Sequence, residues 1–253
     1  MPTCPQFEPE KTLSKILIAN ERSDATMFSK GAFVERLPLA LTYAANLEPQ
    51  DSAVLFYDNL VVAAEYFCAF IEEGMRRHEV ACFTGLEPTR YRRLFEQVGI
   101  NVAELENCGY LRNLSTDDIL HEIENINGRE SGRDGDNLLR GGLDDEPSGI
   151  RFVHIQNPRA LEENSIENLM DAERRTHRLS SFPTTSICCY EARLILDMPS
   201  DFFKDLLEAH DHCLFQGIAM PTSKLLNLQG DSVYPRLRSA WAEDRHKPDL
   251  RQL

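Results

Sequence analysis

Polar side chains stand at the ends of two short apolar runs, where a parallel sheet would bring them together. Tyr57 and Asp58 follow one run, and Tyr190 and Glu191 follow another. Buried parallel strands open into a ligand crevice at their carboxyl ends. A tyrosine beside a carboxylate suits a small polar or amphipathic ligand there. Equally, each tyrosine can pack under a helix while its acid caps that helix.

The candidate site extends this pattern to further polar groups. Cys189 can face a ligand, although a buried structural cysteine is the commoner case. No GxSxG motif supports a nucleophile, so we assign no catalytic residue. The candidate ligand-binding residues are Tyr57, Asp58, Thr84, His154, Gln156, Cys189, Tyr190, Glu191 and His210.

One short stretch, residues 210–213, contains metal-ligating residue types. Its two histidines and Cys213 suit zinc if the segment is extended. The alternative is that His210 ends a helix and Cys213 enters a buried strand. The neighbouring Cys188 and Cys189 point to opposite faces of a strand, which disfavours joint chelation. We therefore expect no metal and no cofactor.

Short apolar runs alternate with helical patterns from residue 52 onward, which is typical of βαβ units on a parallel sheet. The pattern predicts an α/β fold, doubly wound, with a mostly parallel sheet and helices on both faces. Expected strands are 52–57, 79–84, 109–114, 150–155, 185–190 and 212–218; expected helices are 33–45, 60 to about 76, 88–98, 116–125, 158–179 and 200–210.

Three regions follow from the composition along the chain. Residues 1–50 form an N-terminal extension that is partly helical, residues 51–220 form the main domain, and residues 221–253 form a C-terminal tail. Residues 127–149 are rich in glycine and charge, which predicts a mobile insertion within the main domain.

Charge and cysteine content limit the classes of partner. The 253 residues include 27 Lys and Arg against 41 Asp and Glu, a net charge of −14, which disfavours direct nucleic-acid binding. Seven cysteines without a CxxC pair favour a reducing, cytoplasmic setting. Neither a leader pattern nor an 18-residue apolar segment indicates a membrane. Assembly into a homo-oligomer stays open.

Phosphate-binding machinery is missing after the first strand. A P-loop needs a glycine-rich turn, a lysine and a hydroxyl residue before its helix. Here Asp58 and Asn59 alone separate strand from helix, and either can cap it. A carboxylate of Asp58 at the helix start would occupy the place of a phosphate. We therefore expect no P-loop ATPase activity.

Five short motifs together resemble a known family. They are Leu55-Phe56-Tyr57-Asp58, Val80-Ala81-Cys82-Phe83-Thr84, residues 95–102, Ile187-Cys188-Cys189-Tyr190-Glu191 and Leu207-Glu208-Ala209-His210. The order of these motifs resembles the MEDS domain, a sensory domain named for methanogen and methylotroph proteins and the DcmR regulator. The resemblance covers about residues 50–220 and implies a RecA-like three-layer sandwich without a working P-loop.

This chain departs from the family at two places. Asp51-Ser52 stands where the family usually has a histidine, and His154-Ile155-Gln156-Asn157 replaces its usual acidic motif. The resemblance implies a non-catalytic sensor of a small-molecule ligand that acts in signal transduction or transcription regulation through a protein partner. Two alternatives are a hydrolase or transferase that uses Tyr190, Glu191, His154 or Cys189, and an interaction module whose pocket is closed.

Overall fold

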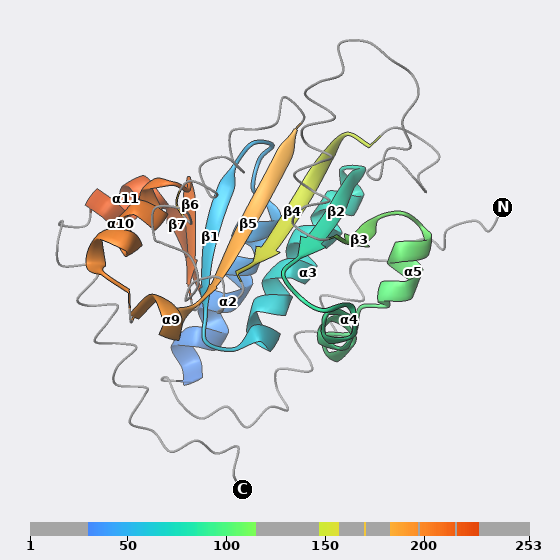
Figure 1. Cartoon of the computed structure of the whole chain (residues 1–253), viewed down its shortest axis with the longest axis horizontal. Helices are drawn as coiled ribbons and strands as arrows, with labels where there is room; N and C mark the ends of the chain where they lie inside the picture. The colour runs from blue at the N-terminus through green and yellow to red at the C-terminus, as the bar shows by residue number, and fades with distance from the viewer. Residues whose placement is uncertain are drawn as a thin grey trace, which may run out of the picture.

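A seven-stranded sheet forms the centre of the molecule (Figure 1). The computed structural model describes residues 30–114, 147–156, 170, 183–196, 198–215 and 217–227. The strands are β1 (Ser52–Tyr57), β2 (Glu79–Thr84), β3 (Leu111–Asn113), β4 (Gly149–Ile155), β5 (Thr184–Glu191), β6 (His212–Phe215) and β7 (Ile218–Pro221). Their order across the sheet is β3-β2-β4-β5-β1-β6-β7.

The strands pair in parallel, except for the last pair in the order across the sheet. β1 lies between β5 and β6, and among the described strands β7 alone is antiparallel, against β6. β2 and β4 are buried along almost their whole length, which explains why most of their residues are apolar and do not alternate with exposed polar ones. The carboxyl ends of β1, β2, β4 and β5 therefore share one edge of the sheet, called here the carboxyl edge.

Helices cover both faces of the sheet. They are α2 (Lys30–Ala45), α3 (Leu60–Arg76), α4 (Pro88–Gln97), α5 (Val102–Asn107), α9 (Ala192–Leu196), α10 (Ser200–Glu208) and α11 (Thr222–Asn227). One core consists of residues from the four helices α2, α3, α4 and α5 and of every second strand residue, such as Leu55, Phe83 and Cys189. The second core joins α9 and α10 with the intervening residues, such as Phe56 and Tyr190. The predicted α/β class is therefore confirmed, with a layer of helices on each side.

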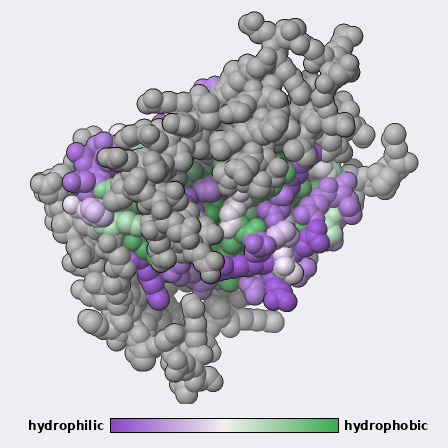
Figure 2. All heavy atoms as spheres, in the orientation of Figure 1, coloured by the Kyte–Doolittle hydropathy of each residue, from purple (hydrophilic) through white to green (hydrophobic). Residues whose placement is uncertain are grey.

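α4 has one face in the core and one face in solvent. α4 begins with Pro88 at its first turn, buries Tyr91, Leu94 and Phe95, and leaves its arginines outside. Figure 2 shows the hydrophilic surface that results over this part of the molecule. Among the described helices, none is long and apolar enough to cross a membrane.

Most predicted elements within the described residues are confirmed. β1 and β2 have the expected bounds, and the other strands differ by a few residues. Three short helices, α5, α9 and α11, were not predicted because each has only five or six residues and too few turns for a periodic pattern. The predicted helices 116–125 and 158–179 and most of the insertion 127–149 lie outside the described residues, apart from the helical Met170 and residues 147–149.

The predicted last strand, 212–218, is wrong in one respect. It consists of two antiparallel strands, β6 and β7, with Gly217 between them at φ 78°. Glycine adopts this left-handed conformation without steric cost, so it permits the reversal. β7 crosses the predicted boundary at residue 220, and α11 packs against α10, β6 and β7. At the other end of the chain, α2 of the predicted extension packs against α3.

Glu72 is an unusual buried acid on α3. Only 2% of its surface is exposed, and within the described structure neither carboxylate oxygen has a hydrogen-bond partner. Burial raises the pKa of Glu72 to about 7, although Arg76 opposes the shift. The folded state therefore holds the proton more tightly than the unfolded state does. Stability from this group is present below about pH 4.5 and is lost as the pH rises through about 7.

We expect Glu72→Gln to be more stable than the parent at pH 8, by about 1–3 kcal/mol, and nearly equal to it at about pH 5. Urea unfolding at both pH values measures the difference. Glu73→Gln is the matched control. Burial also raises the pKa of Glu73, but hydrogen bonds from Arg76 and Arg77 outweigh burial and leave it lowered. Glu73→Gln should therefore lose stability at pH 8, and a gain equal to that of Glu72→Gln would contradict this account.

Candidate functional site

Eight of the nine predicted ligand-binding residues lie at the carboxyl edge. Tyr57 and Glu191 are register partners at the ends of β1 and β5, and Thr84 and His154 are partners on β2 and β4. The backbone N–H of Gln156 donates to the carbonyl of Cys189 at 2.9 Å, which joins the ends of β4 and β5. Parallel pairing thus brings together residues that are far apart in sequence.

The sheet divides these residues between its two faces. Tyr57 and Cys189 lie with the core of α3 and α4, and alternation places Glu191 on the same side. Tyr190 lies with the opposite core, and alternation places Thr84 and His154 on that side too. The candidate residues therefore form two groups, one over each face, instead of a single cluster.

Tyr57 is the central residue of the first group. Burial raises the pKa of its phenol, and the nearby Cys189 and Glu191 raise it further, while Arg90 opposes them. The hydroxyl consequently stays protonated at neutral pH and is able to donate a hydrogen bond. Arg90 belongs to α4 and was not predicted, because an exposed arginine in a charged helix has no distinctive pattern. A phenol, a carboxylate and a guanidinium together suit a ligand with both hydrogen-bonding and charged groups.

His154 and Gln156 form the second group. The His154 Nε2 lies 2.8 Å from the Oε1 of Gln156, so the ring N–H donates to the amide oxygen. The imidazole also stacks on Phe152, with ring centroids 6.3 Å apart. Together these contacts fix the orientation of the imidazole at the end of β4.

Asn59, and not Asp58, caps α3. The cap of α3 is Asn59, whose Oδ1 accepts a hydrogen bond from the N–H of Val61 at 2.8 Å. Its backbone is extended, as an N-cap residue requires, and its uncharged amide satisfies one of the free N–H groups of the first turn. Of the two caps expected from the sequence, Asn59 is therefore the one found.

His210 does not join the site. It precedes β6, and the next residue, Asp211, donates its N–H to the carbonyl of Ser52 at the start of β1. Tyr57 is at the other end of β1, roughly 16 Å away along the strand. The buried His210 ring instead lies with its Nδ1 2.7 Å from the carbonyl of Leu206. The helix-end interpretation of this histidine therefore agrees with its position.

Residues 210–213 do not converge on one point. His212 contacts Tyr43 and Asp51, whereas Cys213 is buried in the opposite core, where burial raises the pKa of its thiol to about 12. Across the described residues, no group of three or more His, Cys, Asp or Glu side chains is placed to hold a metal ion.

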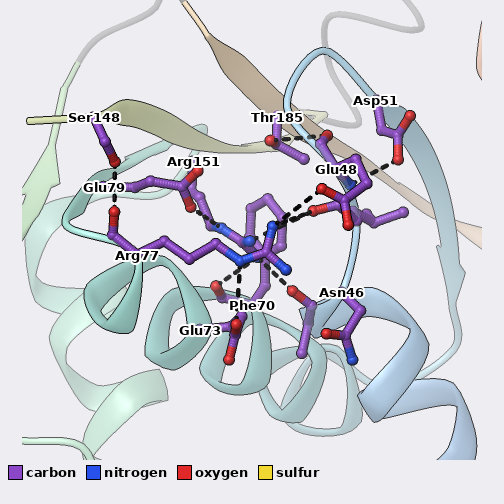
Figure 3. Close-up of polar contacts among 12 residues, drawn as sticks. Asn46, Glu48, Asp51, Phe70, Glu73, Arg77, Glu79, Ser148, Arg151 and Thr185 are labelled. Atoms are coloured by element: carbon purple, nitrogen blue, oxygen red, sulfur yellow. Dashed lines mark hydrogen bonds and ion pairs between the residues drawn. The ribbon is translucent and has the colours of Figure 1, made fainter.

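A buried ion pair lies at the opposite, amino edge of the sheet (Figure 3). The Nε of Arg151 lies 2.6 Å from the Oε2 of Glu79, and both side chains are almost fully buried. The Nη1 of Arg151 donates to the carbonyls of Ala45 and Phe70, at 2.9 and 3.0 Å. Its guanidinium carbon also lies 4.5 Å from the centroid of the Phe70 ring.

This ion pair has a structural role. Arg151 joins the end of α2, the middle of α3 and strands β2 and β4. Burial lowers the pKa of Arg151, and the hydrogen bond to Glu79 opposes that shift. Sequence analysis missed the pair, although one signal was available: Arg151 interrupts an otherwise apolar strand, and a buried charge requires a partner.

Comparisons with known proteins show no family for this chain. No family model matches the chain, and no curated protein matches it. A solved structure from Pyrococcus horikoshii OT3, described as the structural study of a project target, is similar with 10% identity and a TM-score of 0.48. The match covers 70% of this chain and 86% of the other. Its description assigns no function.

Proposed function

We propose that this chain is a non-catalytic sensory domain that binds a small molecule at the carboxyl edge and signals through a protein partner. The observation that carries the proposal is the grouping of Tyr57, Glu191 and Cys189 beside Arg90 on one face of the sheet ends. The sequence resemblance to the MEDS domain supports the same function. A mostly parallel sheet with helices on both faces agrees with the RecA-like architecture that the resemblance implies. The cysteine content supports a cytoplasmic setting.

An enzyme at this edge is the second candidate, and the geometry gives it less support. A cysteine nucleophile needs a histidine within hydrogen-bond reach. Cys189 and His154 lie on opposite faces of the sheet, and the His154 Nε2 is already bonded to Gln156. Tyr57 has a raised pKa, which keeps it protonated instead of activating it as a base.

Ligand binding is tested by a thermal-shift screen of small polar and amphipathic molecules. A molecule that binds only the folded state at about 100 times its Kd stabilises it by about 2.7 kcal/mol. For a domain of this size we expect the Tm to rise by about 5–10 °C. The absence of any shift across a broad screen at millimolar concentrations would contradict the proposal.

Variants then locate the ligand. We expect Glu191→Gln and Tyr57→Phe each to reduce the Tm shift by at least half, because each removes one polar group from the proposed site. Tyr43→Phe is the matched control, since it deletes the same phenol hydroxyl at the amino edge. Equal shifts in all three variants would place the ligand elsewhere.

ATP should not bind at the carboxyl edge with a Kd tighter than about 1 mM, or about −4 kcal/mol. The first turn of α3 is capped by Asn59, and the sequence has no P-loop lysine or glycine-rich turn there. Calorimetric titration with ATP and magnesium measures the affinity. Asn59→Gly, which frees the backbone amides, should remain just as weak because it adds no cation. A micromolar Kd for the parent would overturn both the site assignment and the sensory function.

A further inference from the structure

Three side chains lie in contact with one another at the amino edge of the sheet, outside the proposed ligand site. The Nδ1 of His212 lies 2.7 Å from the hydroxyl of Tyr43, and its Nε2 lies 3.2 Å from the Oδ2 of Asp51. Tyr43 belongs to α2, Asp51 immediately precedes β1, and His212 begins β6. The carboxylate, imidazole and phenol thus come together from three separate segments.

Neighbouring contacts hold this arrangement in place. The Asp51 Oδ2 also accepts the N–H of Glu48 at 2.7 Å. Beside His212, the Asp211 Oδ2 accepts both the N–H and the Oγ–H of Ser52, at 3.0 and 2.9 Å, which fixes the start of β6 against β1. The rings of Tyr43 and His212 meet edge to face, with centroids 5.5 Å apart.

The two contacts favour one tautomer of the imidazole. The Oδ2 of Asp51 lies 3.2 Å from the Nε2 of His212, and a carboxylate there favours the tautomer that carries its proton on Nε2. The Nδ1 then carries a lone pair and accepts the hydrogen bond from the Tyr43 hydroxyl. This is the order found in activated nucleophiles: a hydroxyl, a base within 2.6–3.2 Å, and a third group that orients the base.

Reagents can reach the three residues. The side chains of His212 and Asp51 are 17% and 29% exposed, and Tyr43 is partly exposed. Burial, and secondarily Asp51, raise the pKa of Tyr43. The phenol is therefore protonated at neutral pH and needs a base in order to react.

We propose that Tyr43 is a nucleophile that His212 and Asp51 activate, and that it accepts acyl groups from activated esters. The phenol oxygen attacks the ester carbonyl while its proton passes to the Nδ1 of His212. The bond between the carbonyl carbon and the leaving oxygen then breaks, and that oxygen takes a proton from the imidazolium. Asp51 stabilises the imidazolium between the two steps. The product is an acyl ester of Tyr43, which water can hydrolyse with the same base.

p-Nitrophenyl acetate tests the proposal on the full chain. Release of p-nitrophenol gives the rate, and mass spectrometry of the peptides gives the acetylated residue. General-base assistance contributes about 10²–10⁴-fold, so we expect Tyr43 to react at least tenfold faster than Tyr110. Tyr110 is a fair internal reference because its ring also lies near an imidazole, that of His78, at 6.3 Å. Equal labelling of the two tyrosines would overturn the proposal.

Three variants distinguish a catalytic role of these residues from a purely structural one, in which the contact of Tyr43 with His212 only holds α2 in place. Tyr43→Phe should abolish labelling at position 43, and His212→Gln should slow labelling of Tyr43 about tenfold or more. Ser52→Ala removes one hydrogen bond to Asp211 but keeps the one from the backbone N–H of Ser52. It also keeps the three reacting residues, so its rate should stay within about twofold of the parent. A loss in Ser52→Ala as large as that in His212→Gln would show that the role is structural.

The pH dependence of the labelling rate is a second test, because a purely structural contact would not change it. In the parent protein the labelling rate should rise less steeply with pH, because the imidazole takes the phenol proton. In His212→Gln it should keep rising, because hydroxide alone then removes the proton. Identical profiles for the two proteins would refute base activation. Circular dichroism on each variant confirms that only folded protein is compared.

Discussion

Arg151→Met should lose about 3–5 kcal/mol of the free energy of unfolding. The substitution leaves Glu79 as a buried carboxylate without its cation, and it removes the donor to the carbonyls of Ala45 and Phe70. Glu79→Gln should cost less, because those carbonyls continue to solvate the guanidinium. Urea unfolding followed by circular dichroism gives both values.

Arg77 provides the matched control on the same edge of the sheet. Its Nε lies 3.1 Å from the Oε1 of Glu73, but the two side chains are 26% and 19% exposed. Water screens such a pair, so Arg77→Met should cost less than about 1 kcal/mol. If both arginine variants lost the same free energy, burial would not be the reason for the cost.

The strands could be predicted because burial on both faces of the sheet gives them an unmistakable composition. Ser52–Tyr57 and Glu79–Thr84 are short apolar runs with clear polar ends. α5 and α11 escaped prediction because six residues do not show a helical period. The hairpin of β6 and β7 was missed because the turn at Gly217 is short and apolar residues continue on both sides of it.

The site was harder to predict than the fold, since contacts across the sheet depend on strand order. Tyr57 and Glu191 could be expected at one edge, because each ends a parallel strand. His210 was assigned to the same set, but the polarity of β6 places it at the other end of β1. The contact between Tyr43 and His212 spans 169 residues, and no local pattern indicates it.

Gly85 occupies a position where the ends of β2 and β4 approach closely. It follows β2 directly, and its φ is 93°. A Cβ added there would lie 1.9 Å from the carbonyl oxygen of Ile155, the last residue of β4. That oxygen belongs to the backbone of a paired strand, so it cannot move away as a flexible side chain could.

Gly85→Ala should therefore lose about 3 kcal/mol or more of the free energy of unfolding, from backbone strain and the clash together. Gly99→Ala isolates the first contribution: Gly99 has φ 86°, but nothing lies within 4 Å of an added Cβ, so its cost should be about 1–2 kcal/mol. Urea unfolding of the two variants measures the difference. Equal costs would show that the strand ends can separate freely. A larger cost for Gly85→Ala would show that the ends of β2 and β4 are held close together. Thr84 and His154 are paired at these ends, so the same close approach keeps them side by side at the carboxyl edge.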